Sequence, residues 1–413
     1  MTRKAMISGA SIAGPVLAFW LAEAGWQVTV VERADRLRLS GYPVDVRGTA
    51  VEVITRMGLH PELVEHRYRH VPLTLLSPRG RRLCTLDYGG LLSSLGDGDV
   101  ELLRGDLSAV LHRATADRVD YVFSESITGL RECDGGLEVA YERRPPEVVD
   151  VVIGADGIHS NVRALAFGPE ERYLRHLGPY AAIWDLPPGM FAPGTGYLYS
   201  HPGRTVVVER QADGTPARAF AAFMHPAPGT VDRRDGAAVI AALREAFADD
   251  RWRTAEVIDT LAHADDVYFD TVSQVRMPRW SSGRVALVGD AAYAPAFLSG
   301  QGTSIAIAGA YVLASELCAH ERPQDAYTAY ERRMRDYVTN NQDLALRPDG
   351  TVLVLTRGQL LRRNVKLWAV PWLQRLGLLG LLQAPLRTAA TGLALAEGDL
   401  RCRSETVQRN ACR

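Results

Sequence analysis

The sequence predicts an α/β fold in which a Rossmann-like domain is interrupted by an inserted antiparallel β-sheet and followed by a helical C-terminal segment. Three observations predict it. The chain opens with an apolar strand, a glycine turn and an apolar helix, and a second strand then ends at Glu32. Between residues 171 and 271 short runs alternate apolar and polar positions, which is typical of half-buried antiparallel strands. From residue 346 onward the pattern is largely helical.

The length of 413 residues suits two or three domains of ordinary size. We expect the parts to be discontinuous in sequence, because α/β patterning returns after the inserted sheet. The predicted parts are residues 1–75, 98–170 and 272–345 for the Rossmann-like domain, 76–97 and 171–271 for the inserted domain, and 346–413 for the helical segment.

Composition excludes several classes of function. A formal net charge of -1 leaves no polycationic surface for nucleic acid. Only Lys4 and Lys366 are lysines, which excludes a mechanism that needs an internal lysine as nucleophile or base. The five cysteines form no C-x-x-C pair, so neither a metal site nor a redox disulfide is predicted. We expect reduced thiols in a cytoplasmic protein.

No targeting or membrane-spanning segment is predicted. Gly9, Gly14 and Pro15 interrupt the N-terminal apolar stretch, and no cleavage-like boundary follows it. Prolines and polar residues interrupt the Leu-rich segment Trp368–Leu386, so it is too broken to span a membrane. The tail from Val365 to Leu386 has three interpretations: a lid on a substrate site, contact with a membrane surface, or packing against the first domain. The lid and the packing are favoured.

The first motif is Gly9-x-Ser11-x-x-Gly14, with Glu32 at the end of the next strand. Gly9 permits a tight turn and Gly14 permits close packing of helix on strand, so the helix N-terminus faces a pyrophosphate. The spacing of Glu32 is that of a carboxylate accepting ribose hydroxyls. The motif predicts dinucleotide binding, and the alternative is a glycine turn in an unrelated α/β fold.

The second motif is Gly154-Ala155-Asp156-Gly157, followed by Ser160-x-x-Arg163. Here a buried strand ends in a turn that contains a carboxylate. Taken without the other motifs, a plain strand-to-helix turn with Asp156 or Ser160 as the helix cap is the favoured interpretation.

The third motif is the most specific. An apolar strand over 284–288 ends at Gly289-Asp290, and a loop runs through Pro295 to a glycine pair at a helix start. Asp290 can accept a hydrogen bond from a ribityl hydroxyl, and the amides of the helix start can donate to an anion or an electron-rich ring edge. The glycine pair stands in the run Gly300-Gln301-Gly302-Thr303-Ser304.

In this order and spacing the three motifs resemble the class A flavin monooxygenases, the superfamily of para-hydroxybenzoate hydroxylase. The resemblance covers roughly residues 1–345. It implies FAD bound without a covalent link, with ADP at the first motif and the ribityl chain at Gly289-Asp290. The Asp156 motif is associated in this family with both FAD and nicotinamide binding.

The segments Gly41–Asp45 and Arg104–Leu107 resemble the tetracycline-inactivating branch in particular. That resemblance implies that Asp45 and Arg104 contact FAD and that Arg38 lies near the nicotinamide. The expected cofactor-binding residues are Gly9, Ser11, Gly14, Glu32, Arg33, Arg38, Asp45, Arg104, Asp156, Gly289, Asp290, Gly302 and Thr303, and the expected flavin-lining loop includes Pro295, Gly300, Gln301 and Gly302.

Three positions depart from the family pattern. Ser11 replaces a glycine, Tyr293 stands where many members have histidine, and Ser304 replaces a frequent asparagine. These departures affect the expected flavin environment rather than the identity of the cofactor.

The family chemistry implies that NADPH or NADH reduces FAD and that dioxygen then gives a flavin C4a-hydroperoxide. This species inserts one oxygen into a small, aromatic or polyketide-like substrate. No catalytic base is assigned, although His159, His201 and His225 are possible. The candidate substrate walls, for which packing in a sheet core is an equal alternative, are Tyr197, Tyr199, Phe220 and Phe223.

Other functions are considered beside this one. A flavin halogenase is disfavoured, because Trp184-Asp185-Leu186-Pro187 is a poor match to the halogenase signature and an internal lysine is lacking. A flavin oxidoreductase without oxygen transfer, and a flavoprotein that sequesters a small molecule, stay as alternatives. The sequence does not choose between a monomer and a homodimer.

Overall fold

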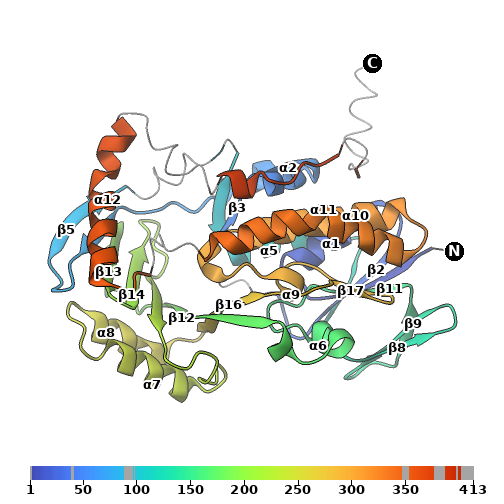
Figure 1. Cartoon of the computed structure of the whole chain (residues 1–413), viewed down its shortest axis with the longest axis horizontal. Coiled ribbons are helices and arrows are strands. Elements are labelled where there is room, and N and C mark those ends of the chain that lie inside the picture. Colours follow the sequence, from blue (N-terminus) through green and yellow to red (C-terminus); the bar gives the residue numbers. More distant parts are fainter. Residues whose placement is uncertain are drawn as a thin grey trace.

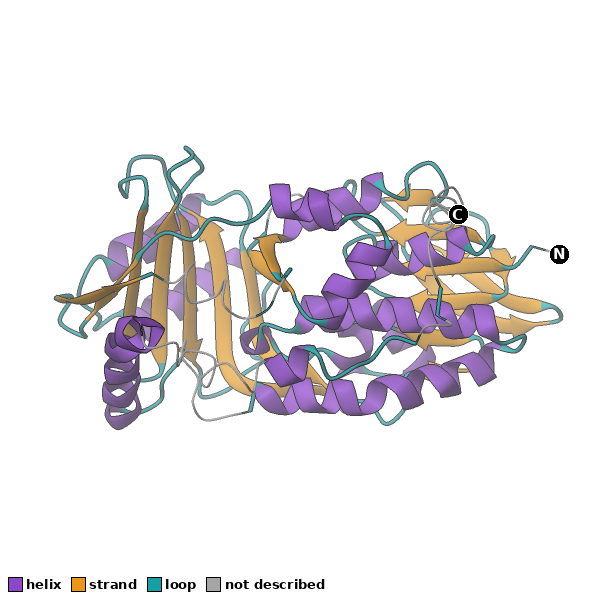
Figure 2. Ribbon diagram, turned by 90° about the horizontal axis from the view of Figure 1, so that it is seen from above, coloured by secondary structure: helices purple, strands orange, loops and turns teal. Residues whose placement is uncertain are grey.

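The computed structural model describes residues 2–38, 41–87, 96, 98–346, 353–375, 387–396 and 399–400. Two large β-sheets occupy opposite ends of an elongated molecule, and most of the helices lie against the sheet that contains the N-terminal strand (Figures 1 and 2). The first sheet carries the glycine motifs, and the second faces them across the middle of the molecule. This arrangement is the mixed α/β architecture expected from the sequence.

The first sheet has six strands in the order β17-β18-β11-β1-β2-β7. Its pairs are parallel except at the edge, where β17 runs antiparallel to β18. Parallel strands buried on both faces need apolar side chains throughout, and β11 is buried along its whole length. The strands are β1 (Lys4–Ser8), β2 (Gln27–Glu32), β7 (Asp120–Phe123), β11 (Val151–Gly154), β17 (Ser281–Ser282) and β18 (Val285–Leu287).

Helices and two small sheets complete this domain. Helix α10 packs between α1 and α11 and is long and apolar enough to cross a membrane, but 78% of its apolar window is buried inside the protein. The helices are α1 (Ala13–Glu23), α2 (Thr49–Arg56), α3 (His60–Glu65), α5 (Arg104–Arg113), α6 (Asn161–Phe167), α9 (Asp290–Tyr293), α10 (Gly302–Ala319) and α11 (Pro323–Leu344). The small sheets pair β3 (Pro43–Val46) with β6 (Val100–Leu103), and β8 (Ile127–Cys133) and β10 (Glu147–Val149) with β9 (Gly136–Tyr141).

The second sheet has seven strands in the order β16-β12-β15-β14-β13-β4-β5. It is antiparallel except where β13 and β4 pair in parallel. Two strands cross the boundaries expected from the sequence, because β4 begins at Leu73 and β16 continues to Val275. The strands are β4 (Leu73–Leu76), β5 (Arg82–Leu86), β12 (Leu174–Asp185), β13 (Thr195–His201), β14 (Arg204–Arg210), β15 (Arg218–Met224) and β16 (Tyr268–Val275).

The two faces of the seven-stranded sheet have different neighbours. One face buries a core beneath α7 (Gly236–Phe247) and α8 (Thr254–Asp259). The other face is shared by the 295–300 loop of the first domain and by α12 (Arg357–Arg375), which contacts β5 and β13. The described part of the C-terminal segment therefore packs on this sheet through α12. It packs on the first domain through residues 387–396, where Asn341 donates to the Ala389 carbonyl.

Candidate active site

The first glycine motif forms a cradle closed by backbone atoms. Gly9 has a φ of +111°, and a Cβ there would lie 2.4 Å from the Ala155 carbonyl oxygen. A Cβ on Gly14 would lie 1.9 Å from the carbonyl oxygen of Gly9. Helix α1 has no side-chain cap and no acidic residue in its first turn, so its N-terminal amides are available to an anion.

Glu32 is held beside this cradle by two backbone amides. Its carboxylate oxygens accept hydrogen bonds from the amides of Ala10 and Ala34, each at 3.0 Å. Both bonds fix the carboxylate at the carboxyl end of β2, next to the turn that follows β1. This is the position expected for a carboxylate that binds a ribose.

Arg104 connects the glycine cradle with the third motif. It begins α5 directly after β6, and its Nη2 donates to Ser11 Oγ at 2.9 Å. Burial raises the pKa of Asp290, and the charge of Arg104 opposes this shift, so the two side chains lie in one electrostatic neighbourhood. Arg104 is thus hydrogen-bonded to the cradle at Ser11 and acts electrostatically on Asp290.

Asp290 presents an accessible carboxylate beyond the carboxyl end of β18. It follows β18 at the start of α9, and its side chain is exposed to solvent. Nevertheless, the surrounding protein raises its pKa by desolvation. An ionised carboxylate that is accessible in this way can accept hydrogen bonds from the hydroxyl groups of a ligand.

The loop over 295–302 is strained and tightly held. Ala296 has a φ of +85° and a ψ of 146°, a conformation that is almost restricted to glycine. Gln274 Nε2 donates to the Pro295 carbonyl at 3.0 Å, and Gln342 Nε2 donates to the Tyr293 carbonyl at 3.2 Å. The side chain of Gln301 is fully buried, and neither its oxygen nor its nitrogen has a partner among the described residues.

This loop leads into α10, whose first turn contains Gly302 and Thr303 and lacks a side-chain cap or an acidic residue. Gly300 has a φ of +64°, and a Cβ there would lie 3.4 Å from Asp45 Oδ2. Asp45 pairs with Arg47 at 2.6 Å. Burial raises the pKa of Asp45 to about 7, against the opposing charge of Arg47. Uncapped amides and an unpartnered buried amide suit a polar heterocycle edge.

Four aromatic rings join this loop to the seven-stranded sheet. The ring of Tyr42 lies 4.9 Å from Phe297 and 5.4 Å from Tyr268. Phe297 stacks on Phe220 at 5.7 Å. Burial raises the pKa values of Tyr42 and Tyr268, so both hydroxyls keep their protons well above neutral pH. The cluster is an apolar wall with two hydroxyl donors.

Of the four substrate-wall residues expected from the sequence, only Phe220 belongs to this cluster. The other three lie on the opposite face of the sheet: Tyr197 and Tyr199 pack against Trp252, and Phe223 stacks on Tyr180. Phe223 and Tyr197 pack in the core beneath α7 and α8, and alternation along β13 puts Tyr199 on the same face, against Trp252. Their expected role as walls is therefore corrected to core packing.

The carboxylate of Asp156 caps a helix. It accepts hydrogen bonds from Ser160 Oγ at 2.5 Å and from the amides of Asn161 and Val162 at 2.9 and 3.1 Å. These bonds hold the turn after β11 against the Gly9 cradle, where the Asp156 Cα would lie 3.0 Å from a Cβ on Gly9. The carboxylate of Asp156 thus serves as a helix cap, as one of the two interpretations of this motif expects. The backbone of the same turn borders the cradle.

Arg163 ties this second motif to the third. Its side chain is fully buried. It donates to the carbonyls of Ala291 at 3.0 Å and Ile158 at 2.6 Å and to Glu170 at 2.9 Å. Burial lowers the pKa of Arg163, and Glu170 opposes this shift. The guanidinium thus fixes α6 and α9, and with them the position of Asp290.

Two histidines bridge carboxylates between the domains. His159 lies 2.9 Å from both Glu170 and Asp270. Burial disfavours its charged form, but the hydrogen bonds to Asp270 and Glu170 outweigh this and raise its pKa to about 9. His70 lies 2.8 Å from Glu101 and 3.7 Å from Glu209 of the sheet. His159, one of the three possible bases, is therefore an imidazolium at neutral pH and is poorly suited to accept a proton.

This pairing predicts a loss of stability at alkaline pH. The pKa of His159 is raised from 6.5 to about 9, so its contribution is complete below pH 6.5 and disappears as the pH rises through 9. We expect the free energy of unfolding to fall by about 1–2 kcal/mol over this window after solvent screening. Urea unfolding at several pH values checks it. His159→Gln should show a flatter profile, and an unchanged slope in that variant would refute the assignment.

The other residues singled out in the sequence make no hydrogen bond or ion pair with the described residues of the cradle or of the 295–302 loop. Arg33 and Arg38 are exposed in the segment that follows β2. His225 Nδ1 lies 2.9 Å from the carbonyl of Ala227, in an exposed turn. His201 ends β13 and is half-buried.

The departures from the family pattern have local explanations. The hydroxyl of Tyr293 accepts from Tyr330 at 3.0 Å, and it occupies space that a Cβ on Gly309 would fill, 2.0 Å away. Tyr293 therefore points into the helical core. Ser304 accepts from the amide of Arg47 at 3.0 Å and donates to the carbonyl of Asp45 at 3.1 Å, which fixes β3 to α10.

Comparisons with known proteins agree with this geometry. A family model described as FAD binding domain matches residues 2–345. The uncharacterized protein Rv1260 of Mycobacterium tuberculosis is 41% identical over 344 residues, which cover 82% of this chain and 91% of that protein. A flavin-dependent monooxygenase of Legionella longbeachae is 34% identical over 347 residues, covering 82% of this chain and 87% of that protein.

Among solved structures, the tetracycline destructase Tet(55) superimposes with a TM-score of 0.82 at 30% identity, covering 96% of this chain and 99% of that chain. The family match spans the three glycine motifs and most of both large sheets. The chain therefore belongs to the FAD-binding domain family and is a class A FAD-dependent monooxygenase.

Proposed function

We propose that this monooxygenase uses NADPH or NADH and dioxygen to insert one oxygen atom into a small, electron-rich aromatic or polyketide-like compound. The observation that carries the proposal is the aromatic cluster of Tyr42, Phe220, Tyr268 and Phe297. It joins the flavin-lining loop to the sheet and offers an apolar wall with two protonated hydroxyls. Flat apolar compounds with few polar groups suit such a wall. The similarity to a tetracycline destructase supports a substrate of this kind.

The cradle, Arg104, Asp290 and the 295–302 loop would together hold FAD. The Gly9–Gly14 cradle and the α1 N-terminus would hold the pyrophosphate together with Arg104, and Glu32 would bind the ribose. Asp290 would accept from the ribityl chain. The α10 N-terminus and the unpartnered Gln301 amide would meet the polar edge of the ring. When bound, FAD would supply hydride acceptance and oxygen activation.

The protein itself would orient the substrate and exclude water. Phe220 and Phe297 are stacked on each other, and Tyr42 packs edge-on against Phe297. The hydroxyls of Tyr42 and Tyr268 stay protonated, because burial raises their pKa values, and they can donate to a phenol or carbonyl oxygen of the substrate. A dry cleft protects oxygenating chemistry from wasteful peroxide release.

The nicotinamide cofactor would approach from the surface of the same domain. The sequence holds one βαβ unit with the glycine fingerprint, so no separate nicotinamide domain is indicated. The exposed side chains of Arg33 and Arg38 would offer cationic contacts for a phosphate. Asp156 would act through the turn that its carboxylate braces.

The proposal is tested by anaerobic stopped-flow reduction and by product mass. We expect a true substrate to accelerate flavin reduction about tenfold or more, which requires only about 1.4 kcal/mol of preference for the reducible state. A panel of polycyclic and phenolic compounds is screened for stimulated NAD(P)H oxidation. A product heavier by one oxygen atom supports the proposal. Stimulated oxidation that yields hydrogen peroxide alone across the panel supports the oxidoreductase alternative instead.

Asp290→Ala is expected to weaken FAD binding about 10- to 150-fold, because a carboxylate hydrogen bond contributes about 1.5–3 kcal/mol. The measurement is reconstitution of apoprotein with FAD, followed by flavin fluorescence. Asp325→Ala, on an exposed carboxylate in the first turn of α11, is the matched control and should bind FAD normally. Equal affinities in the two variants would remove Asp290 from the proposed site.

Acid precipitation is expected to release all of the flavin. The structure places no cysteine or histidine among the described residues of the cradle or of the 295–302 loop, and these are the side chains that commonly attach flavins covalently. The test is the absorbance of the supernatant and the pellet after precipitation. Flavin retained in the pellet would contradict the expectation.

A further inference from the structure

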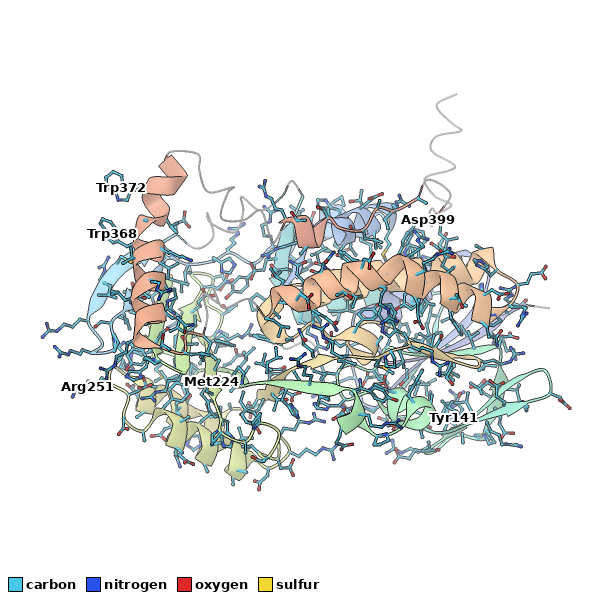
Figure 3. All side chains as sticks on the ribbon, in the orientation of Figure 1. Tyr141, Met224, Arg251, Trp368, Trp372 and Asp399 are labelled. Atoms are coloured by element: carbon cyan, nitrogen blue, oxygen red, sulfur yellow. The ribbon has the colours of Figure 1, made fainter. Side chains whose placement is uncertain are left out.

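Helix α12 carries a stripe of exposed apolar side chains. The stripe consists of Leu361, Val365, Trp368 and Trp372, which are 67%, 57%, 61% and 57% exposed. Their spacing of four, three and four residues places them on one face of the helix. Figure 3 shows Trp368 and Trp372 projecting from the same side of α12, away from the rest of the molecule.

The opposite face of α12 fixes the direction of this stripe. Leu360, Leu367 and Val370 are buried, and Leu367 packs with Leu75 and other residues of the seven-stranded sheet. Arg363 is also buried and donates to Ser200 Oγ on β13 at 3.0 Å. The helix is therefore held on the sheet by one face, at an end of the long axis of the molecule, and presents the stripe outward (Figure 1).

The charge of α12 is of one sign. The helix contains no Asp or Glu, and its basic residues are Arg357, Arg362, Arg363, Lys366 and Arg375. Helical periodicity places Arg357 on one border of the stripe and Arg362 on the other. Arg357, Arg362 and Lys366 are exposed. Because the whole chain has a net charge of -1, this is a local concentration of positive charge.

We propose that α12 docks on the surface of an anionic lipid bilayer. Tryptophan is enriched at the interface between membrane and water, because its ring is apolar and its N–H is polar. An apolar stripe bordered by Arg and Lys is typical of helices that lie in the plane of the interface. The buried contacts of Leu360, Arg363 and Leu367 keep the helix on the sheet, so it lies on the bilayer and does not span it.

The charge also decides against a second copy of the chain as the occupant. A symmetric dimer formed by this face would bring the basic borders of two α12 helices together without a carboxylate from either helix. An anionic headgroup layer instead pairs with both borders at once. This inference is independent of the substrate of the enzyme.

The test is flotation of the full-length, FAD-loaded protein with vesicles. One set is phosphatidylcholine alone, and the other is an equal mixture with phosphatidylglycerol. We expect the protein to float with the anionic set, to float much less with the neutral set, and to dissociate as salt is raised. A blue shift of tryptophan emission on the anionic set should accompany binding.

Two variants assign the binding to the stripe. Trp368→Ser/Trp372→Ser should weaken binding to anionic vesicles by about tenfold or more, and Arg357→Gln/Arg362→Gln by about fivefold per charge removed. The matched control is Val148→Ser/Leu165→Ser, which removes two apolar side chains that are 46% and 40% exposed on the first domain and should bind like the native chain. Circular dichroism and flavin content confirm that each variant is folded.

Three outcomes would overturn the inference. The native chain could fail to float with the anionic vesicles. The tryptophan variant could float as well as the native chain. Sedimentation velocity could show a dimer that the tryptophan variant abolishes, without any vesicle binding, and the stripe would then be an interface between copies.

Discussion

Gly14→Ala is expected to abolish FAD binding and to lower the free energy of unfolding by about 2–4 kcal/mol. The new Cβ would lie 1.9 Å from the carbonyl oxygen of Gly9 and 3.1 Å from its carbonyl carbon. Both atoms belong to the backbone, so no side-chain rotation can relieve the overlap. Gly9 is itself enclosed by Ala155 and Asp156, so the turn that receives the pyrophosphate must move.

The matched control is Gly236→Ala, at the start of α7. A Cβ there has no atom within 4 Å, and the φ of Gly236 lies outside the left-handed region. We expect this variant to be neutral or about 0.4–1 kcal/mol more stable, because alanine restricts the unfolded chain. Flavin content and thermal melting are measured for both variants. If Gly14→Ala retains native flavin content and melting temperature, the cradle is not as rigid as its geometry indicates.

Local patterns predicted the cofactor half of the molecule well. Gly9, Gly14 and Glu32 are close in sequence, and their spacing specifies a strand, a turn and a helix without reference to the rest of the chain. The family identification made from them is confirmed by the family match over residues 2–345. The individual contacts with FAD stay predictions.

For the seven-stranded sheet, the sequence did not predict which face each side chain would lie on. Tyr199 pairs with Val206, and Val206 with Ala221, so Tyr199 shares a face with Ala221 and lies opposite Phe220. Alternation within one strand does not show whether side chains of two different strands share a face, because that depends on the register between the strands. Nor does the sequence say which face α7 and α8 will cover.

The sequence did not reveal several candidate site residues, because they lie far apart in the chain and meet only in the fold. Tyr42, Tyr268 and Phe297 come from three distant segments and meet at one point. Gln274 and Gln342 hold the strained Ala296 loop from β16 and α11. The sequence did not single out Gln274, because three other polar residues stand in β16, and only the fold shows which carbonyls its buried amide meets.

Arg163→Met is expected to destabilise the protein by about 3–5 kcal/mol and to weaken FAD binding although Arg163 lies outside the proposed contacts. Methionine fills the volume but leaves the carbonyls of Ala291 and Ile158 without this donor, and Glu170 keeps its contact with His159 but loses the one with Arg163. Since Ala291 directly follows Asp290, the loss of this brace should loosen the carboxylate at the ribityl position. Urea unfolding and FAD titration measure the two effects.

Arg244→Met is the matched control, because it removes the same charge from an exposed ion pair. Arg244 pairs with Asp259 at 2.8 Å, but both side chains are more than half exposed, so this variant should change stability by less than about 1 kcal/mol. Addition of saturating FAD should recover part of the stability lost in Arg163→Met, because the cofactor binds only the folded chain. If FAD affinity is native in Arg163→Met while stability falls, Arg163 supports the fold but does not position Asp290. If FAD affinity and stability are both native in Arg163→Met, the three hydrogen bonds of Arg163 contribute less to stability than the burial of its side chain implies.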